Sequence, residues 1–375
     1  MKNILYYIYA AIFYMYNIFP VKSKKTTFIM THDSSINGNI MRMYKEVIKN
    51  QPDHICKFIT KGCKNKKKII KIGYYIKFIF ITPYYLATSK TIFLDNVFLP
   101  MAYMRFRKEV NIVQLWHGCN TLKKFGQLSN EGKLKILEKK ANSRYTHVIV
   151  SSKEMIKLHK EAFDVKEEVI YPLGLPRLDL FFDESKIIEE KKKFYLEFPQ
   201  LKGKKIILYA PTFRDDKLDK FDKNMNLNSI INKMPNDYIL INKFHPFVSK
   251  KYGKIEGNRM LDMSEYEDLT RLMLVSDRLI SDYSSIVFDY AILNKPIIFY
   301  AYDKDEYENN IRGFYQDYIR YAGNYVKSKN EIINVLTGRE QNISTIKMKN
   351  IEWIQYKDKN SSERIYKYIY CGSSI

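Results

Sequence analysis

The sequence predicts an α/β protein with two domains, each built around a parallel β-sheet. At 375 residues the chain is too long for one ordinary hydrophobic core. Short apolar runs alternate along it with polar breaks and amphipathic stretches. Within most of these runs successive residues are apolar, which is typical of strands buried on both faces of a parallel sheet.

The predicted strands fall into two consecutive sets. The first set comprises 26–32, 54–60, 91–96, 111–118, 146–152 and 168–174, and the second comprises 204–213, 237–246, 278–284 and 295–303. A charge-dense helical stretch, Asp183–Phe198, separates them, and a final helix is expected around Ile351–Tyr370. The boundary is therefore predicted within 179–202, which gives domains 1–180 and 181–375.

The composition indicates an anionic partner. Sixty-three Lys and Arg against 41 Asp and Glu leave a net charge of +22, which suits nucleic acid, an acidic membrane or phosphorylated substrates. The four cysteines form no CxxC pair, so we expect a reduced setting without a disulfide framework or a zinc site. Residues 303–305 match the DxD spacing of metal-dependent sugar transferases, but a short acidic loop is the commoner meaning, and no metal is predicted.

Several reaction classes are disfavoured by missing motifs. The sequence has no GxGxxG, GxxxxGK[ST], HExxH or GxSxG. Dinucleotide chemistry, P-loop hydrolysis, zinc proteolysis and the α/β-hydrolase mechanism are therefore not expected.

Two apolar, aromatic segments suggest contact with a membrane. Ile4–Pro20 is followed by lysines and lacks a small-residue cleavage site. Its 17 residues are at the short limit for crossing a bilayer, and its tyrosines suit the interface, although it could also be a core helix of the first domain. Lys64–Leu86 interleaves lysine with Ile, Phe and Tyr, so it is either a membrane-surface helix or a helix packed on the sheet with solvated lysines.

Polar side chains gather where the predicted strands end. These residues are His117, Arg177, Thr212, Arg214, Lys243, His245, Asp282, Ser284 and Ser285. In open α/β sheets, ligands bind beyond the carboxyl ends of the strands. Two such domains facing each other would bring these groups to one cleft, where cations and hydroxyls suit a diphosphate and an imidazole can handle a proton.

The two histidines of this set have a context that favours function. A lone histidine is usually a satisfied core or surface residue. His117, however, directly follows a buried strand, and Gly118 permits a tight turn that would direct the imidazole into the crevice. His245 stands at a strand tip before Pro246. The remaining histidines lack such context, although His32 ends the first predicted strand.

Adjacent serines at the end of a strand have two explanations. Ser284 or Ser285 could simply cap the helix that follows. Two hydroxyls at a strand end, in a sheet whose other ends carry Arg, Lys and His, instead favour phosphate binding at the helix N-terminus. Asp289, one turn into that helix, could orient the donor or bind a ribose hydroxyl, or it could merely complement the helix dipole.

These motifs together resemble the CDP-glycerol glycerophosphotransferase family of teichoic-acid and related cell-surface polymer synthesis. The matching segments are QLWHGCNTLKKFG, YPLGLPRLD, ILYAPTFRDD, NKFHP, and ISDYSSIVFDYAILNKPIIFY followed by RGFYQDY. They occur in the family's order between Asn111 and Tyr318. A looser match, INGNIMRMYKEV, surrounds Asn39.

The resemblance implies a GT-B-like architecture, with two Rossmann-like domains whose parallel sheets face each other across a cleft, and no metal or other cofactor. It implies transfer of glycerol phosphate or a similar alditol phosphate from a CDP-glycerol or CDP-ribitol donor, with release of CMP. The acceptor would be a hydroxyl of a lipid-linked glycan or a polymer at an anionic membrane surface. The basic surface and the N-terminal segment would hold the enzyme at the cytoplasmic leaflet, so it is expected to be peripheral or monotopic on the cytoplasmic face of the cell membrane.

The resemblance also implies a role for each motif residue. His117 would be the base that deprotonates the acceptor, and His245 would stabilise the diphosphate or the leaving phosphate. The other motif residues would bind the donor, with Gly118 and Asp282 in support. They are Arg177, Thr212, Arg214, Lys243, Ser284, Ser285 and Asp289.

One departure and two rival interpretations accompany this assignment. Cys119 and Asn120 replace the small residue and proline that commonly follow WHG in the family, which affects helix entry or the fit of the acceptor. The first rival is a GT-B glycosyltransferase that uses a CMP- or UDP-sugar. The second is a non-enzymatic basic protein that binds a membrane or nucleic acid. That rival leaves the strand-end histidines unexplained, so no nucleic-acid partner is predicted.

Overall fold

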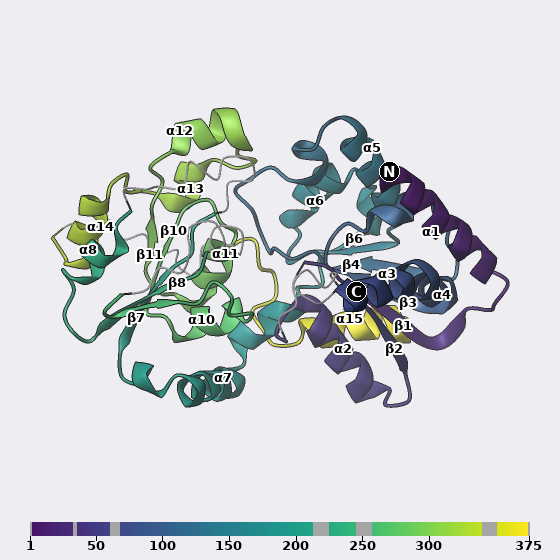
Figure 1. The fold of residues 1–375 in the computed structure, drawn as a ribbon, viewed down its shortest axis with the longest axis horizontal. Coiled ribbons are helices and arrows are strands. Elements are labelled where there is room, and N and C mark those ends of the chain that lie inside the picture. The colour runs from purple at the N-terminus through teal and green to yellow at the C-terminus, as the bar shows by residue number, and fades with distance from the viewer. Residues whose placement is uncertain are drawn as a thin grey trace. The chain divides into compact units, whose positions relative to one another are not determined.

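The chain folds into two compact units, each with a parallel sheet and helices packed against it (Figure 1). This computed structural model describes residues 2–32, 36–60, 68–212, 225–244, 257–339 and 351–373. Unit 1 comprises Met1–Gly118, Phe125–Phe182 and Glu352–Ile375, and unit 2 comprises Cys119–Lys124 and Asp183–Ile351.

Unit 1 is built on a six-stranded sheet with the order β2-β1-β3-β4-β5-β6, in which all neighbours run parallel. The strands are β1 (Lys22–Met30), β2 (Ile55–Thr60), β3 (Ser89–Leu94), β4 (Asn111–Gln114), β5 (His147–Ile149) and β6 (Ile170–Tyr171). Each overlaps a run that the sequence predicted. In β3 the consecutive residues Ile92, Phe93 and Leu94 are fully buried, which confirms burial on both faces.

The helices of unit 1 include one long continuous segment that the sequence marked as basic and aromatic. That segment forms α3 (Lys68–Ile76), the π-helix η1 (Lys77–Ile81) and α4 (Thr82–Thr88). The other helices are α1 (Lys2–Tyr16), α2 (Asn39–Asn50), η2 (Leu99–Tyr103), η3 (Gly126–Leu128), α5 (Gly132–Asn142), α6 (Met155–Phe163), η4 (Glu167–Val169), η5 (Pro176–Phe182) and α15 (Ser361–Cys371).

Unit 2 is built on a five-stranded parallel sheet with the order β11-β10-β7-β8-β9. The strands are β7 (Lys205–Tyr209), β8 (Tyr238–Asn242), β9 (Met260–Asp262), β10 (Arg278–Ser281) and β11 (Ile297–Phe299). The sequence predicted all of them except β9, whose three residues are too few to form a recognisable apolar run.

The helices of unit 2 are mostly short. The longest, α7 (Glu184–Glu197), is the charge-dense helix that the sequence predicted between the two sets of strands, and Asp183 caps it. The others are η6 (Pro199–Leu201), α8 (Leu227–Ile231), α10 (Leu269–Val275), α11 (Ile286–Tyr290), η8 (Ala291–Leu293), α12 (Lys304–Glu306), η9 (Tyr307–Ile311), α13 (Tyr318–Ala322) and α14 (Lys329–Leu336).

Each sheet contains one point at which the strand order reverses. In unit 1 the chain goes from β1 to β2 on one side and then to β3 on the other. In unit 2 it goes from β7 outward to β8 and β9, and then to β10 and β11 on the other side. Ligands of open α/β sheets bind outside the carboxyl ends of the strands at such a reversal. The ends of β1 and β3, and those of β7 and β10, are therefore the places to look for a site.

The last helix, α15, belongs to unit 1, whereas the predicted boundaries placed it in the C-terminal domain. Its first turn is capped by the buried carboxylate of Asp179, which lies in η5 of unit 1. That carboxylate accepts from the main-chain N–H groups of Ser361 and Ser362 at 2.8 and 2.9 Å and from the Ser362 hydroxyl at 2.6 Å. Residues 351–360, predicted as part of the final helix, are not helical.

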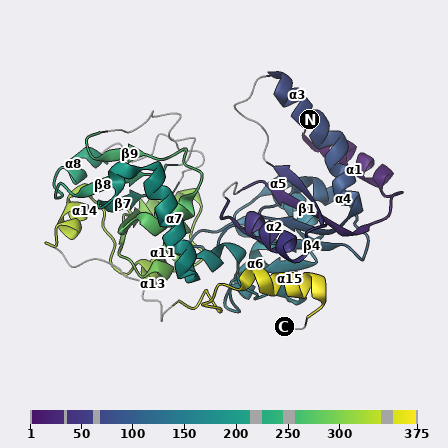
Figure 2. The ribbon, with the colours of Figure 1, turned by 90° about the horizontal axis from the view of Figure 1, so that it is seen from below.

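Helix α1 has one buried and one exposed apolar face. Tyr9 and Phe13 are almost fully buried, and the Tyr9 hydroxyl bonds the Thr82 hydroxyl at 2.6 Å, so one face packs against α4 as a core helix would. Ile8 and Met15 are 46% and 69% exposed. Helix α1 packs along α4 and η1, which continue α3, at one edge of unit 1 (Figure 2). Within the described part of the chain, no helix is both long and apolar enough to cross a bilayer.

Candidate functional site

The strand ends of unit 1 bring three chemically useful residues together. His32 follows β1, Asp95 follows β3 and His117 follows β4, and these three strands are neighbours in the sheet. The His32 and His117 rings are stacked, with centroids 3.5 Å apart and planes 5° from parallel. His32 and Asp95 therefore flank the strand reversal of this sheet, next to the predicted base.

A strained turn presents His117. Trp116 has φ of +53°, a left-handed conformation that is uncommon for a bulky residue. Its N–H donates to the side-chain oxygen of Gln114 at 2.9 Å, and its indole stacks on Phe125 with centroids 5.0 Å apart. These contacts hold the turn in place. Backbone strain that is held this firmly is typical of functional positions.

The hydrogen bond of the His117 ring defines its tautomer. Nδ1 lies 3.0 Å from the main-chain carbonyl oxygen of Asp95. A carbonyl can only accept, so Nδ1 carries a proton, and in the neutral ring Nε2 is the nitrogen that can take one. The side chain is half-buried. A neutral imidazole held in this way can accept a proton at Nε2.

A buried asparagine links the His117 turn to η5, the helix that carries Arg177. The Asn39 amide nitrogen donates to the carbonyl oxygens of Trp116 at 2.9 Å and Leu115 at 3.4 Å. Its side-chain oxygen accepts from the main-chain N–H of Arg177 at 2.9 Å. Two predicted site segments of unit 1 are thus joined through one side chain that is 2% exposed.

In unit 2 a buried aspartate organises the strand reversal. Asp282 follows β10, and one of its carboxylate oxygens accepts from the main-chain N–H groups of Thr212, after β7, and of Tyr283, both at 2.7 Å. Ser284 and Ser285 come next and are partly exposed. Of the predicted residues, the structure therefore brings Thr212, Asp282, Ser284 and Ser285 to one point of the sheet.

Helix capping explains the two serines poorly. Ser285 occupies the N-cap of α11, but its side chain makes no capping hydrogen bond. The Ser284 hydroxyl accepts from the N–H of Ile286 at 3.5 Å, the outer limit of a hydrogen bond. Helix α11 is only five residues long, so its dipole contributes little. Any anion here would depend mainly on hydroxyls, main-chain N–H groups and nearby cations.

Lys243 lies in the same unit, directly after β8, and is partly buried. Its ammonium donates to the carbonyl oxygen of Ser264 at 2.7 Å. Burial lowers the pKa of Lys243 to about 8, against the attraction of Asp262 and Glu267. A further anion beside this ammonium would stabilise its charged form.

Asp289 is buried, whereas the two serines at the start of its helix are partly exposed. It is 3% exposed, and the Cys119 thiol donates to its carboxylate at 3.0 Å. The departure from the family motif at Cys119 therefore has a partner within unit 2. Asn120 is also engaged there, because its side-chain oxygen accepts from Gln316 at 2.6 Å.

The remaining predictions concern two donor-site residues and the DxD-like segment. Arg214 and His245 lie outside the described residues. Asp303, the first residue of the DxD-like segment, accepts a hydrogen bond from the hydroxyl of Tyr283 at 2.9 Å. Among the residues that the structure describes, no group of three or more His, Cys, Asp or Glu side chains could hold a metal ion.

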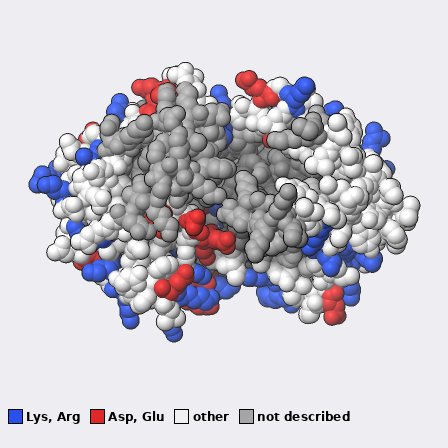
Figure 3. Space-filling view, viewed as in Figure 1, with Lys and Arg blue, Asp and Glu red and all other residues white. Residues whose placement is uncertain are grey.

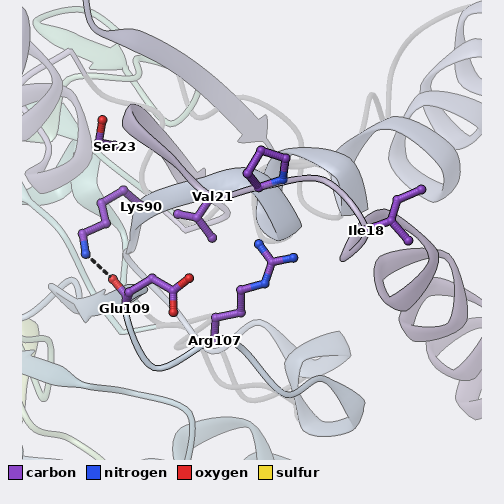
Figure 4. Close-up of a pocket in the computed structure, with 7 residues that line it drawn as sticks. Ile18, Val21, Ser23, Lys90, Arg107 and Glu109 are labelled. Atoms are coloured by element: carbon purple, nitrogen blue, oxygen red, sulfur yellow. Dashed lines mark hydrogen bonds between the residues drawn. The ribbon is translucent and has the colours of Figure 1, made fainter.

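A pocket of about 470 Å³ lies at the opposite end of the unit 1 sheet (Figure 4). Lys90, Arg107 and Glu109 are among its lining residues, close to where β3 and β4 begin. The Lys90 ammonium donates to the main-chain carbonyl of Glu109 at 2.6 Å. Arg107 likewise donates to the main-chain carbonyl of Asn17. None of the predicted site residues lines this pocket.

Comparison with known protein families shows to which family this chain belongs. The family described as CDP-glycerol:poly(glycerophosphate) glycerophosphotransferase matches residues 11–371. The chain belongs to this family. The resemblance seen in the motifs is therefore confirmed, and it extends over the N-terminal third.

Relatives of this chain with curated functions are named as polymerases or primases of teichoic acid. The teichoic acid poly(ribitol-phosphate) polymerase of Bacillus spizizenii is 33% identical over 361 residues, which are 94% of this chain and 57% of the polymerase. The teichoic acid ribitol-phosphate primase of the same species is 30% identical, over 94% of this chain and 92% of the primase. The glycerol-phosphate primase of Bacillus subtilis is 33% identical, over 76% of this chain and 74% of the primase. This chain thus spans little more than half the length of the polymerase.

Solved structures confirm the predicted α/β, GT-B-like fold with two Rossmann-like units. A variant of the wall teichoic acid polymerase TagF superimposes with a TM-score of 0.79 at 23% identity, covering 99% of this chain and 95% of that one. UDP-GlcNAc 2-epimerase from Neisseria meningitidis gives 0.55 at 10% identity, over 92% of this chain and 99% of that one. At these identities the likeness concerns the fold.

Sequence reasoning missed three residues of the His117 environment. His32 was noted only as the end of a strand, and Asn39 only as part of a loose motif. Asp95 ends β3 in TIFLDN, where a polar residue closing an apolar strand was the available signal.

Proposed function

We propose that this chain transfers glycerol phosphate, ribitol phosphate or a similar alditol phosphate from a CDP-alditol donor to a hydroxyl of a teichoic-acid-type polymer or lipid-linked glycan. The observation that carries the proposal is the family match over residues 11–371, together with the His117 imidazole at the strand ends of unit 1. Relatives in the family are named for transferring either ribitol phosphate or glycerol phosphate.

In the proposed mechanism the acceptor hydroxyl attacks the β-phosphorus of the donor. Nε2 of His117 takes the hydroxyl proton while Nδ1 stays bonded to the Asp95 carbonyl. A bond forms between the acceptor oxygen and the β-phosphorus, and the bond from that phosphorus to the bridging oxygen breaks. The bridging oxygen leaves with CMP. Negative charge grows on the phosphoryl oxygens, so cations and N–H donors nearby lower the barrier.

The donor half of this mechanism is assigned to unit 2. Ser284 and Ser285 would bind the phosphates at the strand reversal, with the Lys243 ammonium as a further cation and Thr212 beside them. Arg214 and His245 are assigned to the same task by their place in the family motifs. The solved structures of TagF include one soaked with CDPG, which supports a CDP-linked donor.

The family relationship, and the charges of the described residues on one face, disfavour the rival functions. The curated relatives named above transfer alditol phosphates, which argues against a CMP- or UDP-sugar donor. Among the described residues on the face in Figure 3, Lys and Arg are spread over both units with Asp and Glu among them. A nucleic-acid-binding protein would be expected to gather its cations into one patch.

Thermal stabilisation tests the donor. Purified protein is heated with CDP-glycerol, CDP-ribitol, CMP, CMP-sugars or UDP-sugars, because a ligand of the native state raises the melting temperature by mass action. We expect the CDP-alditols to stabilise the protein, and the Ser284→Ala/Ser285→Ala variant to lose most of that shift. Stabilisation by UDP-sugars alone would refute the proposed chemistry.

We also propose that α1 and the α3–η1 segment bind this enzyme to an anionic membrane surface at its cytoplasmic face. Their exposed apolar side chains include Ile4, Tyr7, Ile8, Met15, Ile72, Tyr75, Ile76 and Phe80. An apolar surface beside lysine-rich segments suits the interface of an anionic bilayer, where an acceptor attached to a lipid would be presented.

Vesicle sedimentation tests this attachment. Ile8→Glu/Met15→Glu should reduce binding to phosphatidylglycerol vesicles at least tenfold. The matched control is Ile188→Glu/Leu196→Glu on α7, where the side chains are 67% and 73% exposed. Equal binding by both variants and the unchanged protein would refute the proposed surface.

A further inference from the structure

The stacked histidines of unit 1 are fixed by one shared residue. The carboxylate of Asp95, 1% exposed, accepts from the main-chain N–H groups of Thr31 at 2.9 Å and His32 at 3.2 Å. Its main-chain carbonyl accepts from Nδ1 of His117 at 3.0 Å. Asp95 therefore sets the backbone that carries one ring and binds the other ring directly.

The hydrogen bond and the ring stack restrain the His117 side chain in different ways. The bond from Nδ1 of His117 fixes the tautomer, but one hydrogen bond still lets the ring tilt about that contact. A second ring face at a centroid distance of 3.5 Å and 5° from parallel removes this tilt. The two ring faces are in van der Waals contact, so neither ring can tilt without pressing on the other. The contact therefore restrains the plane of the His117 ring, whereas the hydrogen bond restrains one atom of it.

We propose that His32 is a positioning residue for the reaction of His117. Its imidazole face holds the plane of the His117 ring, so that Nε2 keeps one direction toward the acceptor hydroxyl. When His117 takes the proton, its imidazolium lies over a neutral aromatic face, which attracts a cation. A second positive charge on His32 would repel it, so His32 acts in its neutral form. This inference rests on the proposed function.

Steady-state kinetics of CMP release tests the inference with three substitutions. His32→Ala should lower kcat about 10- to 100-fold through loss of alignment, with the KM for the donor unchanged. His32→Phe keeps a flat ring and should stay within about threefold of the unchanged enzyme, whereas His32→Gln should resemble alanine. His147→Phe, a replacement in β5 of the same unit, is the control for the chemical change and should leave kcat unaltered.

Spectroscopy of labelled histidines gives a readout that does not need turnover. The His32 ring should shift the His117 ring-proton resonances upfield, and this shift should vanish in His32→Ala and persist in His32→Phe. Unchanged resonances in His32→Ala would overturn the stacking. A full kcat in His32→Ala, or a phenylalanine variant as inactive as alanine, would also overturn the positioning role. Failure of the unchanged enzyme to release CMP from any CDP-alditol would instead refute the proposed function, while the resonances still report the ring pair.

Discussion

Replacing Asn39 with alanine should destabilise unit 1 and impair the His117 turn together. The Asn39 side chain donates to the carbonyl oxygen of Trp116 and accepts from the N–H of Arg177, both at 2.9 Å. Alanine removes both hydrogen bonds, while the Trp116 carbonyl and the Arg177 N–H stay buried. The substitution therefore leaves buried polar groups that have lost their hydrogen bond.

The magnitude follows from the number of bonds. Each buried hydrogen bond contributes about 0.5–1.5 kcal/mol net, and each group left without its partner costs about 1–3 kcal/mol. With two strong bonds and the weaker one to Leu115 at 3.4 Å, the loss should be about 2–4 kcal/mol in the free energy of unfolding. Because the carbonyl of Trp116 precedes His117 directly, kcat should also fall about 10- to 100-fold.

Tryptophan fluorescence in urea isolates this effect. The chain has two tryptophans, Trp116 and Trp353, and both lie in unit 1, so the signal follows that unit even if the two units unfold separately. Asn50→Ala is the matched control on the same helix. Its side chain bonds Glu46 at the exposed surface, and its loss should cost no more than about 0.5 kcal/mol. An unfolding midpoint and kcat of Asn39→Ala equal to those of Asn50→Ala would refute the reasoning.

Further predictions follow for stability and pH. Gly126→Ala should lower the free energy of unfolding by about 2–4 kcal/mol, because φ is +56° and a Cβ would lie 2.2 Å from the carbonyl oxygen of Ala162. Urea unfolding followed by tryptophan fluorescence measures this change. Gly132→Ala, with φ of +55° and no atom within 4 Å of that Cβ, should cost only about 1 kcal/mol. Asp179→Ala should free the first turn of α15 and speed its release by trypsin, and an unchanged digestion rate would contradict the capping role. The pKa of Lys243 is about 8, so its charge is lost as pH rises through that value. The KM for the donor should therefore rise between about pH 8 and 9.5, and Lys243→Arg should abolish the rise.

The fold was predictable because burial on both faces leaves a direct record in the sequence. Ile92–Leu94 of β3 and Ile206–Tyr209 of β7 are apolar on successive residues, and every one of these residues is buried. Strand β9 has three residues, two of them only partly buried, so it leaves no such record. The return of α15 to unit 1 depends on Asp179, whose hydrogen bonds reach residues more than 180 positions away. A capping contact at that separation has no local pattern.

The place of the proposed site residues was predictable where a polar side chain closes an apolar strand, as at His117 and Ser284. It was not predictable where a side chain acts on backbone groups. Asp95 and Asn39 bond N–H and carbonyl groups, which every residue has, so their partners cannot be inferred from residue types. The partner of Cys119 was equally hard to predict. Cys119 departs from the family motif, yet its thiol donates a hydrogen bond to the Asp289 carboxylate. The orientation of His117, the proposed base, thus depends on surrounding residues that the sequence reveals least. Substitutions of those residues test the proposed mechanism more sharply than removal of His117.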